Sequence, residues 1–397
     1  MLLIKNPKFS LLSLSFLLSA VANWIYKLAL PIMILNITGS AYHAASMFGI
    51  SFIPWVLFSL FGGVVADSFR KNRIIWIGNL TASVLTIGLL LGFMVRPLNL
   101  VLIYTLVFFL SSVDPLVHPS FQSLIPEIVP EKDFVKANAN IQTIDNFLSV
   151  IGPLVGGGIV TLFGGSITIL IAVIFFFLAA IMDLFIPSKS THHNFSVRTL
   201  LSDVKVGAQY SVQQKVIFSG SMMFFFTNFG TNMFEANFMY FMTRNLGLTV
   251  FNTTIAMAIA GLGSILAGFV ADKVISPFRS GQVLIVSTIL AGLATLLLVT
   301  TRNYIIIGII LGIVSFLGTI NVITYFSLRQ KTVPQNLLGR VVAVTRMVSY
   351  ASIPVGAWFG GYLLNNGFSM TVVILIAGLI RGLTGVVAHF TPLANEK

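Results

Sequence analysis

The sequence predicts an all-α integral membrane protein with twelve transmembrane helices. Of its 397 residues, 56% are hydrophobic and only 9% are charged, whereas about 25% are charged in an ordinary soluble domain. Apolar segments of about 20 residues, the length of a helix that crosses a bilayer, recur along the whole chain. These segments are much longer than the ~10-residue alternating segments of barrel strands, so helices are expected.

Charged residues and turn residues divide the apolar sequence into twelve predicted spans. They cover about residues 10–35, 43–66, 74–95, 98–118, 137–162, 166–186, 214–241, 250–271, 281–301, 303–327, 339–364 and 368–390. The longest gap is polar and separates six spans from six. We therefore expect an N-terminal bundle over 1–186, a cytoplasmic central loop over 187–213 and a C-terminal bundle over 214–397.

The basic residues predict the orientation in the membrane. The chain has 23 Lys and Arg against 11 Asp and Glu, a formal charge of +12. With the N-terminus inside, only Arg96, Arg244 and Arg302 fall in outside segments, so both termini are expected to be cytoplasmic in a cell membrane. Membrane orientation already accounts for the excess of Lys and Arg, so nucleic-acid binding is not expected. The first span resembles a signal peptide up to Ala22, but the apolar sequence resumes at Trp24, so we expect a retained helix.

The two halves of the chain repeat each other. FGGVVADSFRKNR at the end of the second span matches AGFVADKVISPFR at the end of the eighth, which aligns Asp67 with Asp272. VPEKDFVKANA matches VPQNLLGRVVA at nearly the same offset and aligns Lys136 with Arg340. Six spans in each repeat give both halves the same topology, related by an axis along the membrane normal.

Twelve spans, a central gap and this repeat resemble the major facilitator superfamily. GGVVADSFRKNR at 62–73 is similar to the signature that the superfamily carries between spans 2 and 3. HPSFQSLIPEIVPEKDFVKANA at 118–139, with TGSA at 38–41, resembles the macrolide-efflux-like branch of drug:proton antiporters, and GPLVGG at 152–157 matches the end of the antiporter signature. The upstream glycines of that signature and the arginine of span 4 are absent. The resemblance implies a secondary transporter with the fold of that superfamily.

Ionisable residues inside the spans are candidates for coupling and gating. Each costs roughly 2.5–3.5 kcal/mol near the bilayer centre, so such residues should be paired, cavity-facing or functional. They are Lys27, Asp114, Asp145, Glu235, Arg346 and Arg381, with Asp183 near the inner end of span 6. Proton coupling requires a carboxyl group that gains and loses a proton during transport. The candidates are Glu235 first, then Asp114 and Asp145.

The resemblance implies that spans 1, 4, 7 and 10 line a central cavity, and each has polar residues at helical spacing. The expected cavity residues are Asn23, Lys27, Tyr104, Phe108, Ser111, His118, Asn228, Asn232, Phe238, Met239, Asn321 and Tyr325. Aromatic and methionine walls with few fixed charges suit an amphipathic ligand. The alternative is that these polar residues hydrogen-bond neighbouring helices to one another.

Ionic contacts that form in one state only are expected to gate transport. Lys27 with Glu235 would close the outside, and Asp145 or Asp114 with Arg346 would close the inside. The residues expected to gate the inner side are Asp67, Arg70, Lys71, Arg73, Asp272, Arg340 and Arg346, with Asp67 facing Arg340 or a local arginine. The alternatives are static pairs that satisfy buried charge, and basic residues that only set topology.

Proton-driven export of amphipathic small molecules by a monomer is the predicted function. A lysophospholipid or siderophore transporter of the same fold is the alternative, and a non-transporting receptor is the alternative class. The sequence has no metal, nucleotide-binding or serine-nucleophile motif, so neither an enzyme nor a cofactor is expected. The absence of Cys excludes thiol chemistry, and the absence of charged rings argues against a channel.

Overall fold

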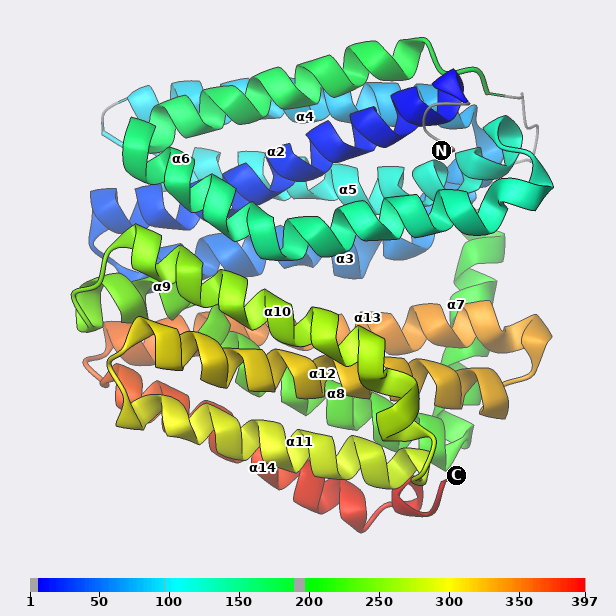
Figure 1. The fold of residues 1–397 in the computed structure, drawn as a ribbon, viewed down its shortest axis with the longest axis vertical. Coiled ribbons are helices and arrows are strands. Elements are labelled where there is room, and N and C mark those ends of the chain that lie inside the picture. The colour runs from blue at the N-terminus through cyan, green and yellow to red at the C-terminus, as the bar shows by residue number, and fades with distance from the viewer. Residues whose placement is uncertain (1–5, 96, 189–196, 397) are drawn as a thin grey trace. The chain divides into compact units, whose positions relative to one another are not determined.

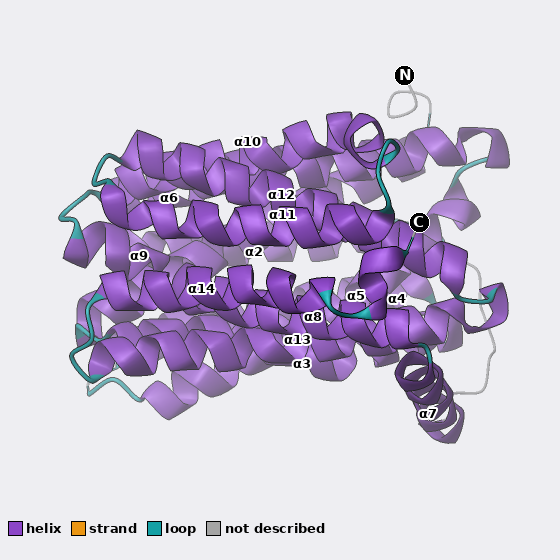
Figure 2. Ribbon diagram, turned by 90° about the horizontal axis from the view of Figure 1, so that it is seen from below, coloured by secondary structure: helices purple, strands orange, loops and turns teal. Residues whose placement is uncertain are grey.

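The computed structural model describes residues 6–95, 97–188 and 197–396, and these residues form helices joined by short loops, without strands (Figures 1 and 2). The helices of the first half are α2 (Pro7–Thr38), α3 (Ala41–Ser68), α4 (Lys71–Met94), α5 (Leu100–Ile128) and α6 (Phe134–Leu184). Those of the second half are α7 (Val197–Gln213), α8 (Lys215–Glu235), α9 (Phe238–Tyr240), α10 (Val250–Ile275), α11 (Ser280–Leu296), α12 (Tyr304–Thr332), α13 (Gln335–Asn365) and α14 (Met370–His389).

These helices account for the twelve predicted spans. Ten of the helices in the described part are long and apolar enough to cross a membrane. One of the ten, α6, contains two spans, because Gly164 leaves the helical conformation with φ of 77°. The twelfth span is α8, whose 21 residues include several Ser, Thr and Asn side chains. The chain is therefore a multi-pass membrane protein with twelve membrane-spanning helices.

The chain divides into two compact units. The first comprises Met1–Met33 and Ile50–Leu200, and the second comprises Ile34–Gly49 and Leu201–Lys397. In the first unit, α4 packs against α5 and α6. In the second, α10 packs against α12, α8 against α13 and α14, and α11 against α12 and α14.

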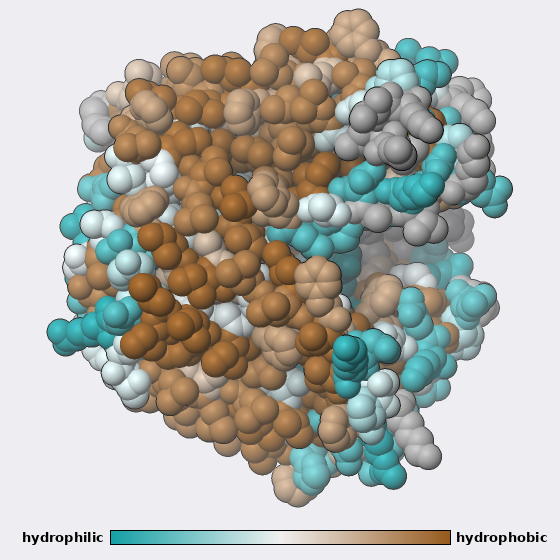
Figure 3. Space-filling model, in the orientation of Figure 1, coloured by the Kyte–Doolittle hydropathy of each residue, from teal (hydrophilic) through white to brown (hydrophobic). Residues whose placement is uncertain are grey.

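Most outward-facing side chains of the second unit's helices are apolar. Over α10, α11 and α12 the surface is hydrophobic, and hydrophilic residues collect near the helix ends (Figure 3). Exposed residues here include Leu266, Phe269, Leu293 and Ile309. Apolar side chains on a helix surface are expected where the helix faces lipid, because the bilayer core has no water to hydrogen-bond polar groups.

Three features differ from the sequence prediction. The polar segment 187–213 was expected to be a loop, but its second part forms α7. The predicted fourth span ends at 118, whereas α5 continues to Ile128 through Pro119 and Pro126. Membrane helices tolerate proline where neighbouring groups satisfy the freed carbonyls. Asp114 therefore lies in the middle of α5, whereas the predicted span 98–118 would place it near the end of the helix.

The third difference is a break in the seventh span. The sequence predicts one helix over 214–241, but α8 ends at Glu235, and Ala236 and Asn237 interrupt it before α9 and a π-helical turn, η2 (Phe241–Asn245). The side chain of Asn237 donates to the carbonyl of Met233 at 2.9 Å, a local bond that competes with regular helix bonding. The break places Glu235 at a helix end.

Candidate functional site

A cavity of about 290 Å³ in the second unit is lined by ten polar residues among apolar ones. Its walls come from α8, α10, α11, α12 and α14. The polar lining residues are Thr227, Asn228, Thr231, Glu235, Ser264, Thr288, Ser315, Thr319, Asn321 and Arg381. Two of the predicted cavity residues, Asn228 and Asn321, are among them, as is the first candidate for proton coupling.

Glu235 and Arg381 are the charged residues of this lining, and they come from adjacent helices. The end of α8 packs with the start of α14 in one hydrophobic cluster, so the two helices run antiparallel. Side chains tilt toward the N-terminus of their own helix, so Glu235 and Arg381 lean toward each other. Their opposite charges attract, but no carboxylate oxygen of the described residues lies within ion-pair distance of Arg381. Glu235 is exposed, whereas Arg381 is only 4% exposed.

Three buried polar atoms around this cavity have no hydrogen-bond partner in the described part of the chain. They are Nε of Arg381, Oδ1 of Asn321 and Oγ1 of Thr227. The amide of Asn321 donates to Oγ1 of Thr288 at 3.0 Å, so this side chain is held in place while its oxygen stays unpaired. The guanidinium reaches toward α12, where a Cβ at Gly318 would lie 3.7 Å from Nη2 of Arg381.

Other predicted cavity residues of the second unit contribute to packing. Asn228 donates to the carbonyl of Ser349 on α13 at 3.0 Å. Tyr325 is 3% exposed, and its hydroxyl donates to the carbonyl of Ile217 at 2.9 Å. These contacts join neighbouring helices, which is the alternative that the sequence left open. Asn232 bonds the carbonyl of Asn228 in its own helix, Phe238 lies in the apolar core between α8, α12 and α14, and Met239 is half-buried.

The first unit brings together three of the predicted ionisable residues and the predicted cavity residue His118. The charge of Lys27 on α2 interacts with that of Asp114 on α5. On α6, Asp145 interacts with Asp114 and with His118. No two of these charges are within ion-pair distance among the described residues. They form a loose cluster of two carboxylates and two bases across three helices.

The remaining predicted cavity residues of the first unit lie on the same helices. Ser111 is buried, and Asn23 bonds the carbonyl of Ser19 in its own helix at 3.0 Å. The ring of His118 contacts Trp55, with centroids 6.3 Å apart, and Phe108 contacts Phe58 at the same separation. Tyr104 is half-buried and also interacts with neighbouring residues.

The predicted inner gate residues have partners that the sequence did not suggest. Lys71 forms a buried ion pair with Glu127 at the end of α5, and Glu127 also accepts from the hydroxyl of Ser188 at 3.1 Å. Arg340 pairs with Asp203 of α7, with 2.8 Å between Nε and Oδ1. The side chain of Asp67, which was expected to face Arg340, lies outside the described residues.

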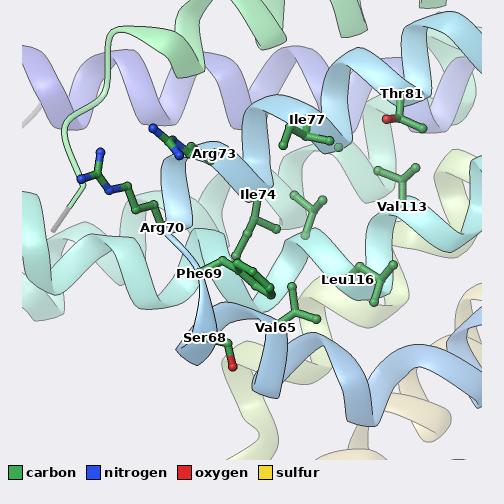
Figure 4. A pocket seen from close by; sticks show the side chains of 12 residues that line it. Val65, Ser68, Phe69, Arg70, Arg73, Ile74, Ile77, Thr81, Val113 and Leu116 are labelled. Atoms are coloured by element: carbon green, nitrogen blue, oxygen red, sulfur yellow. The ribbon is translucent and has the colours of Figure 1, made fainter. Parts of the chain in front are cut away.

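The other gate residues are more open. Arg70 and Arg73 stand at one end of a mainly apolar groove of about 840 Å³ between α3, α4 and α5, with Val65, Val113 and Leu116 farther along it (Figure 4). Asp272 is exposed at the end of α10. Arg346 is exposed and lies over the ring of Tyr350, 6.0 Å from its centroid.

The two expected latches join residues of different units and stay predictions. What the structure adds is a partner for each residue of the outer latch within its own unit. Lys27 has Asp114, and Glu235 has Arg381.

Asp183 is a buried group whose surroundings the sequence did not predict. It is fully buried on α6, accepts a hydrogen bond from Ser15 of α2 at 2.5 Å, and accepts another from Asn79 of α4 at 2.7 Å. Small polar residues within three apolar spans were the available signal. Among the described residues, no group of three His, Cys, Asp or Glu side chains could hold a metal ion.

Comparison with known proteins decides the family. The sequence profile of the Major Facilitator Superfamily matches residues 12–357, which is most of the chain. The chain belongs to the major facilitator superfamily. Members of this family are transporters of small molecules, so the chain is a membrane transporter and not an enzyme. The predicted fold and family are confirmed.

Named relatives cover nearly the whole chain at low identity. The multidrug efflux pump Tap of Mycobacterium tuberculosis is 24% identical over 99% of this chain and 95% of its own length. The staphyloferrin A transporter of Staphylococcus aureus is 26% identical over 87% of this chain and 86% of its own length. The crystal structure of the nucleoside transporter NupG superposes with a TM-score of 0.80 at 15% identity, covering 96% of this chain and 99% of NupG. That likeness shows the shared fold.

Proposed function

We propose that this transporter exports amphipathic small molecules across the cell membrane in exchange for protons. It would work as a monomer with both termini in the cytoplasm, by alternating access of a bundle over 1–186 and a bundle over 214–397. The similarity to the Tap efflux pumps over 99% of the chain supports drug export. Low fixed charge in the spans supports an amphipathic cargo.

The observation that carries proton coupling is the position of Glu235. This carboxyl group ends a membrane-spanning helix, is exposed, and lines a cavity whose other charged residue is Arg381. A carboxyl group in contact with such a space can exchange a proton, and its ionised form is stabilised only loosely, because no cation of the described residues lies within ion-pair distance of it. Asp114 and Asp145 are the next candidates, because they are the other carboxyl groups predicted to lie inside spans 4 and 5, and their charges interact with each other in the first unit.

The experiment measures accumulation of labelled amphipathic compounds in an efflux-deficient host, with and without a protonophore. Expression of the wild-type protein should lower accumulation, and the protonophore should abolish this effect. The variant Glu235→Gln keeps the size and hydrogen-bonding capacity of the side chain but cannot carry a proton, so protonophore-sensitive export should be lost.

Glu131→Gln is the matched control. Glu131 is exposed in a short turn outside the spans, so this variant should export like wild type. Full protonophore-sensitive export by Glu235→Gln would contradict the role of Glu235 in proton coupling. Asp114 and Asp145 would then be the candidates for that role. No export of any compound by a folded wild-type protein would contradict the proposed multidrug function.

A siderophore is the second candidate cargo, because the staphyloferrin A transporter is similar over 87% of the chain. Release of a labelled siderophore from loaded cells, compared between the wild-type protein and an empty vector, tests it. Siderophore release in the absence of drug export would favour this candidate.

A further inference from the structure

The cavity of the second unit contains an arginine whose hydrogen-bonding needs are not met. Arg381 is 4% exposed, and its buried Nε has no acceptor among the described residues. Buried polar atoms are nearly always hydrogen-bonded, and an uncompensated buried charge is strongly destabilising. A group in the cavity that accepts hydrogen bonds from the guanidinium would remove this deficit.

The side chains that line the cavity determine whether the bound group should be an anion or a cation. A guanidinium has five donors and no acceptor, and it matches a carboxylate in planar geometry. The unpaired hydroxyl of Thr227 can donate to the same guest. A metal cation would find oxygen ligands in this lining, but the positive charge of Arg381 would repel it. An anion is therefore the better guest.

We propose that the cavity is an anion site, in which Arg381 binds a carboxylate or a halide and Glu235 is the competing internal counter-ion. A cavity of about 290 Å³ is at the lower limit of pockets that take drug-sized ligands, which begin near 300 Å³. The guest is therefore one acidic substituent of a larger compound or a free small anion, and not a whole amphipathic drug.

Glu235 makes the site depend on pH. Of the described residues that line the cavity from α8, α10, α11, α12 and α14, Glu235 and Arg381 are the titratable ones. An ionised Glu235 repels a bound anion and attracts Arg381 away from it. Protonation of Glu235 ends both effects, so the anion should bind more tightly as the pH falls.

The direct test is thermal unfolding of the purified full-length protein, titrated with sodium chloride, sodium formate or sodium benzoate, with the same titration of Arg381→Gln as the reference for general salt effects. A ligand that binds only the folded state raises the unfolding temperature with a saturable dependence on its concentration. The wild-type protein should show this with at least one of the three anions. In Arg381→Gln the saturable rise of the unfolding temperature with anion concentration should be lost.

Two further variants sharpen the result. Glu235→Gln should bind the same anion at least tenfold more tightly at neutral pH, and its affinity should no longer depend on pH. Arg302→Gln removes an arginine from the exposed loop between α11 and α12, and it should behave like the wild type. An equal anion response in Arg381→Gln, or no saturable response in the wild type, would overturn the proposal. If Arg381→Gln does not fold, unchanged affinity and pH dependence in Glu235→Gln would overturn it.

Transport assays distinguish the two sources of the anion. If the guest is an acidic group of the cargo, Arg381→Gln should lose export of acidic compounds and keep that of neutral analogues. If it is a free halide, export of neutral compounds by the wild type should require chloride. The binding test does not depend on transport, so failure of the proposed export function would leave it interpretable.

Discussion

Close packing of α10 against α12 gives the sharpest stability prediction. A Cβ added at Gly263 of α10 would lie 1.9 Å from the carbonyl oxygen of Gly312 on α12 and 2.9 Å from its Cα. These are backbone atoms, so no side-chain rotation can relieve the clash. Because non-bonded carbon contacts are optimal at roughly 3.5–4.0 Å, Gly263→Ala must push the two helices apart by about 1 Å or more.

The expected loss in the free energy of unfolding follows from the packing between α10 and α12 that this movement disrupts. Overpacking of a well-packed core typically costs about 1–3 kcal/mol. Gly308 also touches α10, since a Cβ there would lie 3.1 Å from Cα of Ala256, and this contact would loosen too. Ser264, the next residue after Gly263, lines the cavity of the second unit, so the substitution should also disturb that site.

The matched control lies on the same helix. Gly268 of α10 has no atom within 4 Å of an added Cβ, so Gly268→Ala should leave stability unchanged or raise it by up to about 1 kcal/mol through helix propensity. Detergent-induced unfolding of both variants, followed by circular dichroism, measures the difference. If Gly263→Ala unfolds at the same detergent concentration as wild type, the inferred close approach of the two helices is wrong.

Three further predictions concern buried polar contacts, and each is measured in the same unfolding assay. Lys71→Met removes one side of a buried ion pair whose side chains are only 10% and 11% exposed, and should cost about 3–5 kcal/mol. The double variant Lys71→Met/Glu127→Met should recover part of this cost. Asn79→Ala removes a donor from buried Asp183 and should cost about 1–3 kcal/mol, and a cost near zero would refute the network. Tyr325→Phe loses two hydroxyl contacts to α8 but keeps the ring, so it should cost about 1 kcal/mol and leave export unaffected, whereas lost export would restore its predicted cavity role.

The fold could be predicted from the sequence because lipid imposes a simple rule. Each apolar run of bilayer length must be a helix, and this rule locates the spans even where it misplaces their ends. It does not predict the break at Ala236 and Asn237, where the Asn237 side chain bonds the carbonyl of Met233. It also does not predict α7, a polar segment that contacts the rest of its unit through an exposed pair of Asp203 with Arg340 and a hydrogen bond from Tyr210 to the carbonyl of Thr332.

Only part of the candidate site was predictable from the sequence: Glu235, Asn228 and Asn321 line the cavity as predicted site residues, and its other polar residues were not among the predicted ones. Glu235 and Arg381 stand out because charge is rare in membrane spans. Their meeting depends on α8 and α14 being neighbours, which no spacing along the chain reveals. Helical spacing also cannot distinguish a residue that lines a cavity from one that hydrogen-bonds a neighbouring helix. Asn228 does both, since it lines the cavity and donates to the carbonyl of Ser349 on α13.

The partners of Lys27 and Glu235 within their own units change what a latch between the units would require. Glu235 is attracted by Arg381, and Lys27 by Asp114, so an outer latch has to overcome these two attractions. The free energy of closing is then the difference between the new ion pair and the two attractions that it replaces. Alternating access needs two states of similar free energy, because a cargo or a proton can shift only an equilibrium that its differential binding can overcome. The attractions on Glu235 and Lys27, for which the described residues show no ion pair, would keep that difference small, and an anion on Arg381 would shift it by weakening the attraction on Glu235.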